Sequence, residues 1–193
     1  MTRLFSTAAA TLAVVAAGFG AGCVAPARLN LANAAPISQA PVSAPGTTIV
    51  ACAPIEDKRL DPEVLGLVGG RPFSASEVSG WVLRSLTGLT SRSFSVRPAA
   101  SVENPPVTLR PRLLKVYVDS IRGTKTAVVV LEVAFIEASG REATLLYRGQ
   151  HAGINWGSDE AEVTAALQKA LGKCADQLRI DLDAQLARIV PRT

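Results

Sequence analysis

The sequence has few of the residues from which metal and redox sites are built. Among its 193 residues there are one histidine and three cysteines. So small a number of these residues argues against a multi-histidine centre or a zinc finger. No motif points to a bound cofactor either. We therefore expect neither a metal nor a cofactor.

A strong excess of charge of one sign is also missing. The chain carries 20 Lys+Arg against 16 Asp+Glu, a formal net charge of +4. This charge is too small and too dispersed to indicate a nucleic-acid partner. Hydrophobic residues make up 48% of the chain, which is enough for a core and excludes disorder throughout. The length is typical of one domain.

The sequence has no apolar run long enough to cross a membrane at its N-terminus. The apolar stretch there, residues 8–19, is broken only by Thr11 and Gly18 and would span roughly 18 Å as a helix, against about 30 Å for a bilayer core. Arg3 precedes this run, and small residues follow it. A positive start, a short apolar stretch and small residues are typical of a secretory signal peptide, here residues 1–22.

The end of this segment, Gly20-Ala21-Gly22-Cys23, resembles the lipobox of bacterial lipoproteins, with Gly20 where Leu or Val is usual. The resemblance implies that Cys23 becomes the first mature residue and carries acyl chains such as palmitate, which hold a protein stably at a membrane. The alternative is ordinary cleavage after Ala27, in an A-x-A site. Because Val24 and not Asp follows the cysteine, the lipoprotein sorting rules imply the outer membrane, facing the periplasm.

Residues 23–46 are predicted to be a flexible tether. They contain four prolines, no acidic residue and no sustained apolar period. A single globular domain is expected to follow over residues 47–190.

If lipid occupies Cys23, then Cys52 and Cys174 remain as an even pair in an oxidising compartment. We favour a disulfide between them, which would close a loop of about 120 residues and stabilise the fold by about 4–5 kcal/mol. The pairing would require the first strand to lie under the middle of the last helix. The alternatives are a reactive thiol and two buried free thiols that never meet.

The apolar patterns predict an α+β fold in the order β-α-β-β-β-β-α. The sheet is expected to be mixed and largely antiparallel, with about five strands and both helices on one face. A capping box, Ser74 and Glu77, predicts that the first helix spans 74–89. A stripe of apolar residues predicts a long second helix from about Asp159 to residue 190. The predicted strands cover residues 47–53, 94–96, 107–118, 127–136 and 144–150.

The order of these features resembles the YajG-like family of bacterial lipoproteins. The similar residues, which extend over most of 47–185, are Asp57-x-Arg59, Gly66, Phe94-Ser95-Val96, Leu113–Asp119 and Leu146-Tyr147-Arg148. The resemblance implies a small, periplasm-facing, membrane-anchored protein that is not an enzyme. The cysteine pair is not part of the family pattern.

The densest polar cluster is Asp57, Arg59 and Asp61. A catalytic interpretation would pair two carboxylates with an arginine; we favour an Asp57–Arg59 contact that holds the loop after the first strand. His151 has no indicated nucleophile or orienting partner, so a catalytic triad is not expected. Trp156, at a strand–helix junction, is a candidate interface anchor, although packing in the core or a loop is the more common role.

Three hypotheses about function follow. The first is a non-enzymatic envelope lipoprotein that acts through protein contacts in the periplasm. The second is an auxiliary lipoprotein of a transport or secretion system that binds lipid or glycan in a groove between sheet and helices. The third, a hydrolase around Asp57 and Asp61, requires a concave site that also contains His151. A loose basic stripe from Arg110 to Arg122 is expected to be a solvated face, with contact to anionic lipid or polymer as the alternative.

Overall fold

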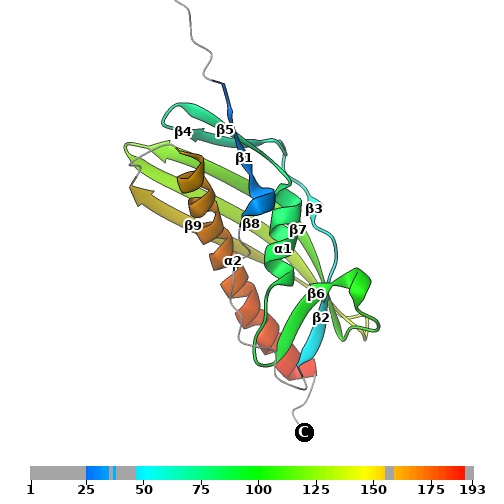
Figure 1. Ribbon diagram of the computed structural model, residues 1–193. Helices are drawn as coiled ribbons and strands as arrows, with labels where there is room; N and C mark the ends of the chain where they lie inside the picture. Colours follow the sequence, from blue (N-terminus) through cyan, green and yellow to red (C-terminus); the bar gives the residue numbers. More distant parts are fainter. Residues whose placement is uncertain (1–24, 35–36, 38–46, 155–158, 190–193) are drawn as a thin grey trace, which may run out of the picture.

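Three long antiparallel strands form the centre of the structure, a computed structural model that describes residues 25–34, 37, 47–154 and 159–189 (Figure 1). Strand β7 (Val107–Ile121) pairs with β8 (Thr124–Glu137), and β8 pairs with β9 (Glu142–Ile154). Gly123 and Gly140 adopt positive φ in the two connecting turns. The predicted strands and the hairpin turn at Gly140 are confirmed, although the strands are longer than expected.

Shorter strands pair with the edge of β7 that does not face β8. Strand β2 (Thr48–Cys52) and the two-residue β3 (Glu56–Asp57) both run parallel to it, at Thr108–Leu109 and at Arg112–Leu113. The carbonyl oxygens of Leu109 and Leu113 accept bonds from this side, from Ala53 and Lys58. Pro111 lies between the two pairings, so its missing N–H faces the gap between β2 and β3.

The remaining strands bring the sheet to nine strands in the described part of the chain. Strand β4 (Val64–Val68) runs parallel to β7 and forms a hairpin with β5 (Arg71–Ser76). Strand β6 (Phe94–Pro98) lies beyond β2. The path through the sheet is β1-β5-β4-β7-β2-β6, with β3, β8 and β9 branching from β7 and β8. The α+β class and the mixed sheet are as predicted, but the expected five strands and their simple order are wrong.

The tether prediction is wrong for residues 27–33. Ala27–Asn30 form β1, which pairs in parallel with β5, and Leu31–Asn33 form the short 3₁₀ helix η1. Ala27 and Leu29 are buried because alternate side chains of a strand point to the core face, and Leu31 of η1 is buried as well. The folded unit therefore begins before the predicted boundary at residue 47.

Helix α1 (Val78–Thr87) begins four residues later than the predicted capping box requires. Residues 71–76 instead form β5, since Phe73 and Ala75 alternate into the core between β1 and β4. Glu77 then turns the chain with a φ of 61° and makes no side-chain cap. Gly88 follows the last residue of the helix, as expected. Pairing with neighbouring strands has overridden the local capping signal.

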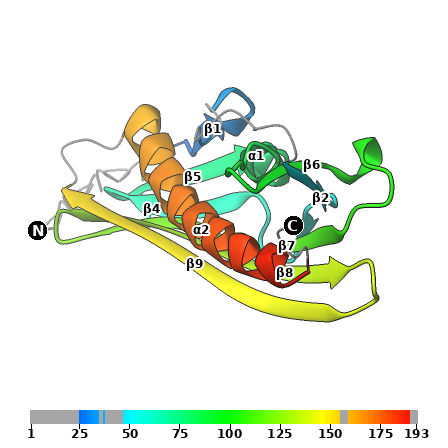
Figure 2. The same ribbon diagram turned by 90° about the horizontal axis from the view of Figure 1, so that it is seen from below.

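Helix α2 (Glu160–Ile189) buries the predicted stripe of apolar residues against the sheet. Both helices lie on the same side of the long strands (Figure 2), as the sequence predicted. The distal half of α2 is held as well, because Ser91 and Ser93 donate hydrogen bonds to Asp183. Among the described residues, no helix is long and apolar enough to span a membrane.

Gly149 allows α2 to lie unusually close to β9. A Cβ at this position would lie 1.8 Å from the carbonyl oxygen of Ala170 and 3.0 Å from the Sγ of Cys174. The first distance is far shorter than non-bonded contact permits, so any side chain would push the helix off the strand. Gly149 is therefore the residue that fixes the distance between helix and sheet.

We predict that Gly149→Ala lowers the free energy of unfolding by about 3 kcal/mol, at the upper end of the usual cost of overpacking. Gly153→Ala is the matched control on the same strand face, because among the described residues its Cβ would meet only the His151 Nε2, at 3.5 Å. Urea denaturation measures both. Equal midpoints for the two variants would contradict the close approach.

Candidate functional site

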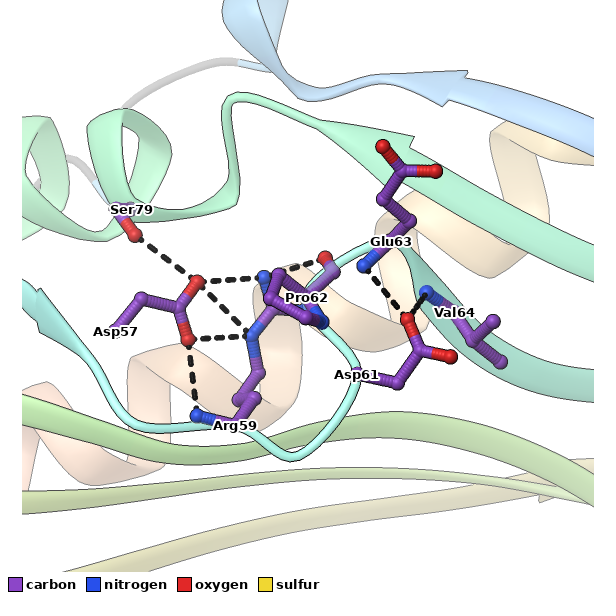
Figure 3. A network of polar contacts seen from close by, with 7 residues as sticks. All are labelled: Asp57, Arg59, Asp61, Pro62, Glu63, Val64 and Ser79. Carbon is purple, nitrogen blue, oxygen red and sulfur yellow. Dashed lines mark hydrogen bonds and ion pairs between the residues drawn. The ribbon is translucent and has the colours of Figure 1, made fainter.

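The predicted Asp57–Arg59 contact is present at the start of the loop after β3 (Figure 3). The Asp57 carboxylate accepts from the Arg59 backbone N–H at 3.1 Å and from its Nε and Nη2 at 2.9 and 2.8 Å. It also accepts from the Ser79 hydroxyl, in the first turn of α1, at 3.3 Å. The Arg59 side chain is only 5% exposed and that of Asp57 22%. This cluster joins the loop to the helix.

The same side chains shape the rest of the loop. The Arg59 Nη2 donates to the Pro62 carbonyl at 2.7 Å, and the Asp61 carboxylate accepts from the backbone N–H groups of Glu63 and Val64. The loop leads into β4, where Gly66 has a φ of 127° and a Cβ would lie 2.1 Å from the Val118 carbonyl oxygen. The polar groups therefore direct the chain into its pairing with β7.

Two opposing effects act on the Asp57 carboxyl. Partial burial raises its pKa, while the hydrogen bonds and the charge of Arg59 lower it further than burial raises it, so the net shift is downward. The Arg59 Nη1 is buried and has no hydrogen-bond partner among the described residues. Asp57 is therefore ionised at neutral pH and engaged by its partners, which is typical of a structural ion pair and not of a general base.

The carboxylates and the histidine of the hydrolase hypothesis do not meet. Asp57 pairs with Leu113 of β7, while His151 of β9 pairs with Ala127 of β8, opposite Val118 of β7. These positions are five residues apart on β7, roughly 16 Å at about 3.3 Å per residue. Asp61 is engaged by its own loop. The arrangement gives no support to catalysis at these residues, and the described residues contain no cluster suited to a metal ion.

The predicted disulfide is wrong, because Cys52 and Cys174 are both free and buried. Cys52 pairs with Leu109, which lies opposite Phe135 of β8, whereas the Cys174 thiol donates to the carbonyl of Val129. Phe135 and Val129 are six residues apart on β8, roughly 20 Å at about 3.3 Å per residue, against the limit of about 7 Å between the Cα atoms of a disulfide. Burial raises the pKa of each thiol to about 12, so neither is a reactive thiolate.

Three surface features emerge only from the fold. A hollow of about 180 Å³ lies between the end of β9 and α2 and contains His151. A larger hollow of about 400 Å³ lies between η1 and α2. The third is β9 itself, whose only strand partner in the described part of the chain is β8. The sequence signal available for the hollow around His151 was the pair Lys169 and Lys173, which lie four residues apart on one face of the helix. Trp156, the predicted interface anchor, lies outside the described residues.

Comparison with known proteins finds a shared fold. No protein-family model and no curated protein matches the chain. Among solved structures, protein XCC0632 from Xanthomonas campestris, of the family DUF330, is similar over 82% of this chain and 96% of its own, with 15% identity and a TM-score of 0.54. An uncharacterized protein is similar over 73% and 96%, with 9% identity and a TM-score of 0.53.

Lipoprotein GNA1162 from Neisseria meningitidis is a weaker match, with 10% identity, coverage of 73% of this chain and 99% of its own, and a TM-score of 0.39. The chain thus has the fold of the DUF330 protein. At these identities the comparisons establish the fold alone.

We predict that the two buried thiols resist alkylation in the folded protein and react in denaturant without a reducing agent. Intact mass measures the number of alkyl groups, and Cys23→Ser removes the third thiol from the count. Two alkyl groups in denaturant alone are expected. Alkylation that needs prior reduction would reinstate the disulfide.

We predict that the Asp57 contacts stabilise the fold above the unfolded-state pKa of about 4 and that this contribution is lost as pH falls through the lower, folded-state pKa. Asp57→Asn should cost about 1–3 kcal/mol at neutral pH, and its stability should decline less steeply in acid than that of the unmodified protein. Urea midpoints from pH 2 to 7 measure both curves. Asp61→Asn is the control, because an asparagine oxygen still accepts both loop bonds; parallel curves for Asp57→Asn and the unmodified protein would contradict the assignment.

Proposed function

We propose that this protein is a non-enzymatic, YajG-like lipoprotein of the bacterial envelope, anchored in the outer membrane through Cys23 and acting in the periplasm by docking another envelope protein. The lipobox supports the anchor, and the fold shared with the DUF330 protein is compatible with this class. The observation that carries the docking role is the open edge of β9.

Strand β9 has 13 residues, and in the described part of the chain only β8 pairs with it. Leu146 and Ile154 are 65% and 69% exposed along it. A long edge strand with apolar side chains invites pairing with another chain, and natural proteins usually shorten, charge or cover such edges. Only part of this edge is covered: the Lys173 Nζ donates to the Gln150 carbonyl at 2.7 Å.

The outer face of the long strands adds area beside this edge. Both helices lie on the opposite side of these strands (Figure 2). Tyr117, Glu132 and Leu146 share the outer face, and the Lys115 Nζ lies 4.4 Å from the centroid of the Tyr117 ring. A partner that adds a strand to β9 would gain main-chain hydrogen bonds from the edge and side-chain contacts from this face, the mode known as β-augmentation.

A second candidate function is favoured by the hollow between η1 and α2. Its volume of about 400 Å³ falls in the range of small-molecule sites, and Leu29, Asn33 and Thr164 are among the residues that line it. It lies between α2 and a segment that pairs with the sheet. The sequence analysis expected a groove for lipid or glycan between sheet and helices but assigned this segment to the tether. An auxiliary protein of a transport or secretion system would use such a groove to hold its ligand.

We predict that a photo-crosslinking residue at position 146 captures a discrete envelope protein in intact cells. Position 180, on α2, is the matched control, because Ile180 is 62% exposed and also apolar but lies away from β9. A crosslinked band at 146 and none at 180 is expected, and Cys23→Ser should weaken the band by releasing the protein from the membrane.

The docking role would be contradicted if neither position captured a protein, or if both captured the same proteins in equal amounts. Intact mass of the membrane-extracted protein checks the anchor separately. A chain that starts at Cys23 and carries acyl mass is expected, whereas a soluble chain that starts later would overturn the anchor without bearing on the edge.

A further inference from the structure

The hollow at the end of β9 gathers more positive than negative charge. Its walls include Lys125, His151 and Ile154 from the sheet, and Glu162, Ala166 and Lys169 from α2. Lys125 is buried, with its side chain 6% exposed, and its Nζ contacts the Glu162 carboxylate at 2.5 Å. That carboxylate is therefore already engaged by one ammonium group.

Two further lysines stand close to this hollow without a carboxylate of their own. Lys169 forms no ion pair among the described residues, and Lys173, one turn further along α2, donates to the neutral Gln150 carbonyl. Like charges four residues apart on a helix destabilise it slightly. The nearby Glu160 is paired with Arg71 at 3.3 Å. Among the described residues, no ion pair therefore offsets the charge of Lys169 or Lys173.

His151 faces the same two lysines. It has no hydrogen-bond partner among the described residues, and its pKa is lowered by burial first, and then by the charges of Lys169 and Lys173. The imidazole is therefore neutral near pH 7 and has an N–H available to donate. The donor groups of His151, from β9, and of Lys169, from α2, thus line one hollow, and Lys173 lies one helical turn beyond it.

We propose that this hollow, lined by Lys125, His151 and Lys169 with Lys173 beside it, binds a phosphate group. Its volume of about 180 Å³ accommodates a phosphate or a small phosphorylated headgroup. Lysine is a common phosphate ligand as a point charge, and a neutral histidine adds a directed donor. The exposed Ile154 at the rim offers an apolar contact to whatever the phosphate is attached to. The hollow adjoins the edge of β9 and shares Ile154 with it, but the proposed site is formed by the side chains of this chain and does not depend on the proposed partner.

The chain provides its own reporter, because His151 is the only histidine in the sequence. The imidazole resonances of the full mature protein give its pKa directly in an NMR titration. A bound phosphate offsets the repulsion from the lysines, so the pKa of His151 should rise by about 1 unit when inorganic phosphate is added. Sodium chloride at equal ionic strength should raise it much less.

Two variants separate binding from general charge effects. Lys169→Gln combined with Lys173→Gln should raise the pKa of His151 without any ligand and abolish the response to phosphate. Lys115→Gln removes a lysine on the outer face of the sheet and should change neither. The variants replace exposed side chains, and circular dichroism checks that they remain folded.

The source of the phosphate is decided by a second ligand, the soluble short-chain lipid dihexanoyl phosphatidylglycerol. A response to both ligands identifies a site for the phosphate group itself, and a response to the lipid alone identifies a headgroup site that also uses the rim. The proposal is overturned if neither ligand shifts His151 beyond the sodium chloride control, or if the double variant responds as the unmodified protein does.

Discussion

The position of α2 against the sheet depends on a close backbone contact at Gly149, which only glycine permits. With no side chain at this position, the Ala170 carbonyl reaches the strand, and the Cys174 thiol packs against it and donates to Val129. The same approach brings Lys173 within reach of the Gln150 carbonyl. The hollow around His151 exists where the two elements diverge beyond this point of contact. One glycine thus determines both the core packing of the helix and the geometry of the neighbouring surface.

A second constraint acts on β7, at the edge that does not pair with β8. Three short parallel segments share that edge, and each needs its own register. Backbone approach at Gly66 sets the last of them, and the Asp57–Arg59 pair holds the loop that leads there. Arg84 of α1 donates to the Leu31 carbonyl, which binds the N-terminal segment to the same side of the molecule. The polar cluster that looked most like an active site therefore serves the topology.

The sequence predicted the features that depend on local periodicity. The buried stripe of α2 and the turn at Gly140 follow from residue spacing alone, and both are present. It failed where long-range pairing decides. The cysteines seemed a natural pair, but spacing cannot reveal the register. Cys52 lies level with Phe135 of β8 and Cys174 bonds to Val129, six residues away along the same strand. Ser74 and Glu77 have the spacing of a capping box, but no helix begins at Ser74. Phe73 and Ala75 of the same segment are buried in the core as part of strand β5.

In the candidate sites too, local contacts could be predicted from the sequence and long-range ones could not. Asp57 and Arg59, two residues apart, could be paired from the sequence, whereas the hollow around His151 brings together Lys125 and Lys169 from elements 44 positions apart in the numbering. The edge of β9 was equally hidden, because a strand pattern does not say which strand is last in the sheet. Features made by tertiary arrangement are the ones from which function is proposed here.

The central functional claim is that the edge of β9 is open in the isolated protein and covered in the envelope. Hydrogen–deuterium exchange of residues 142–154, compared between purified protein and envelope membranes, tests it most directly. The account predicts marked slowing in the membranes for this segment and unchanged exchange in the exposed turn at Gly140. Equal exchange of residues 142–154 in the two preparations would contradict it.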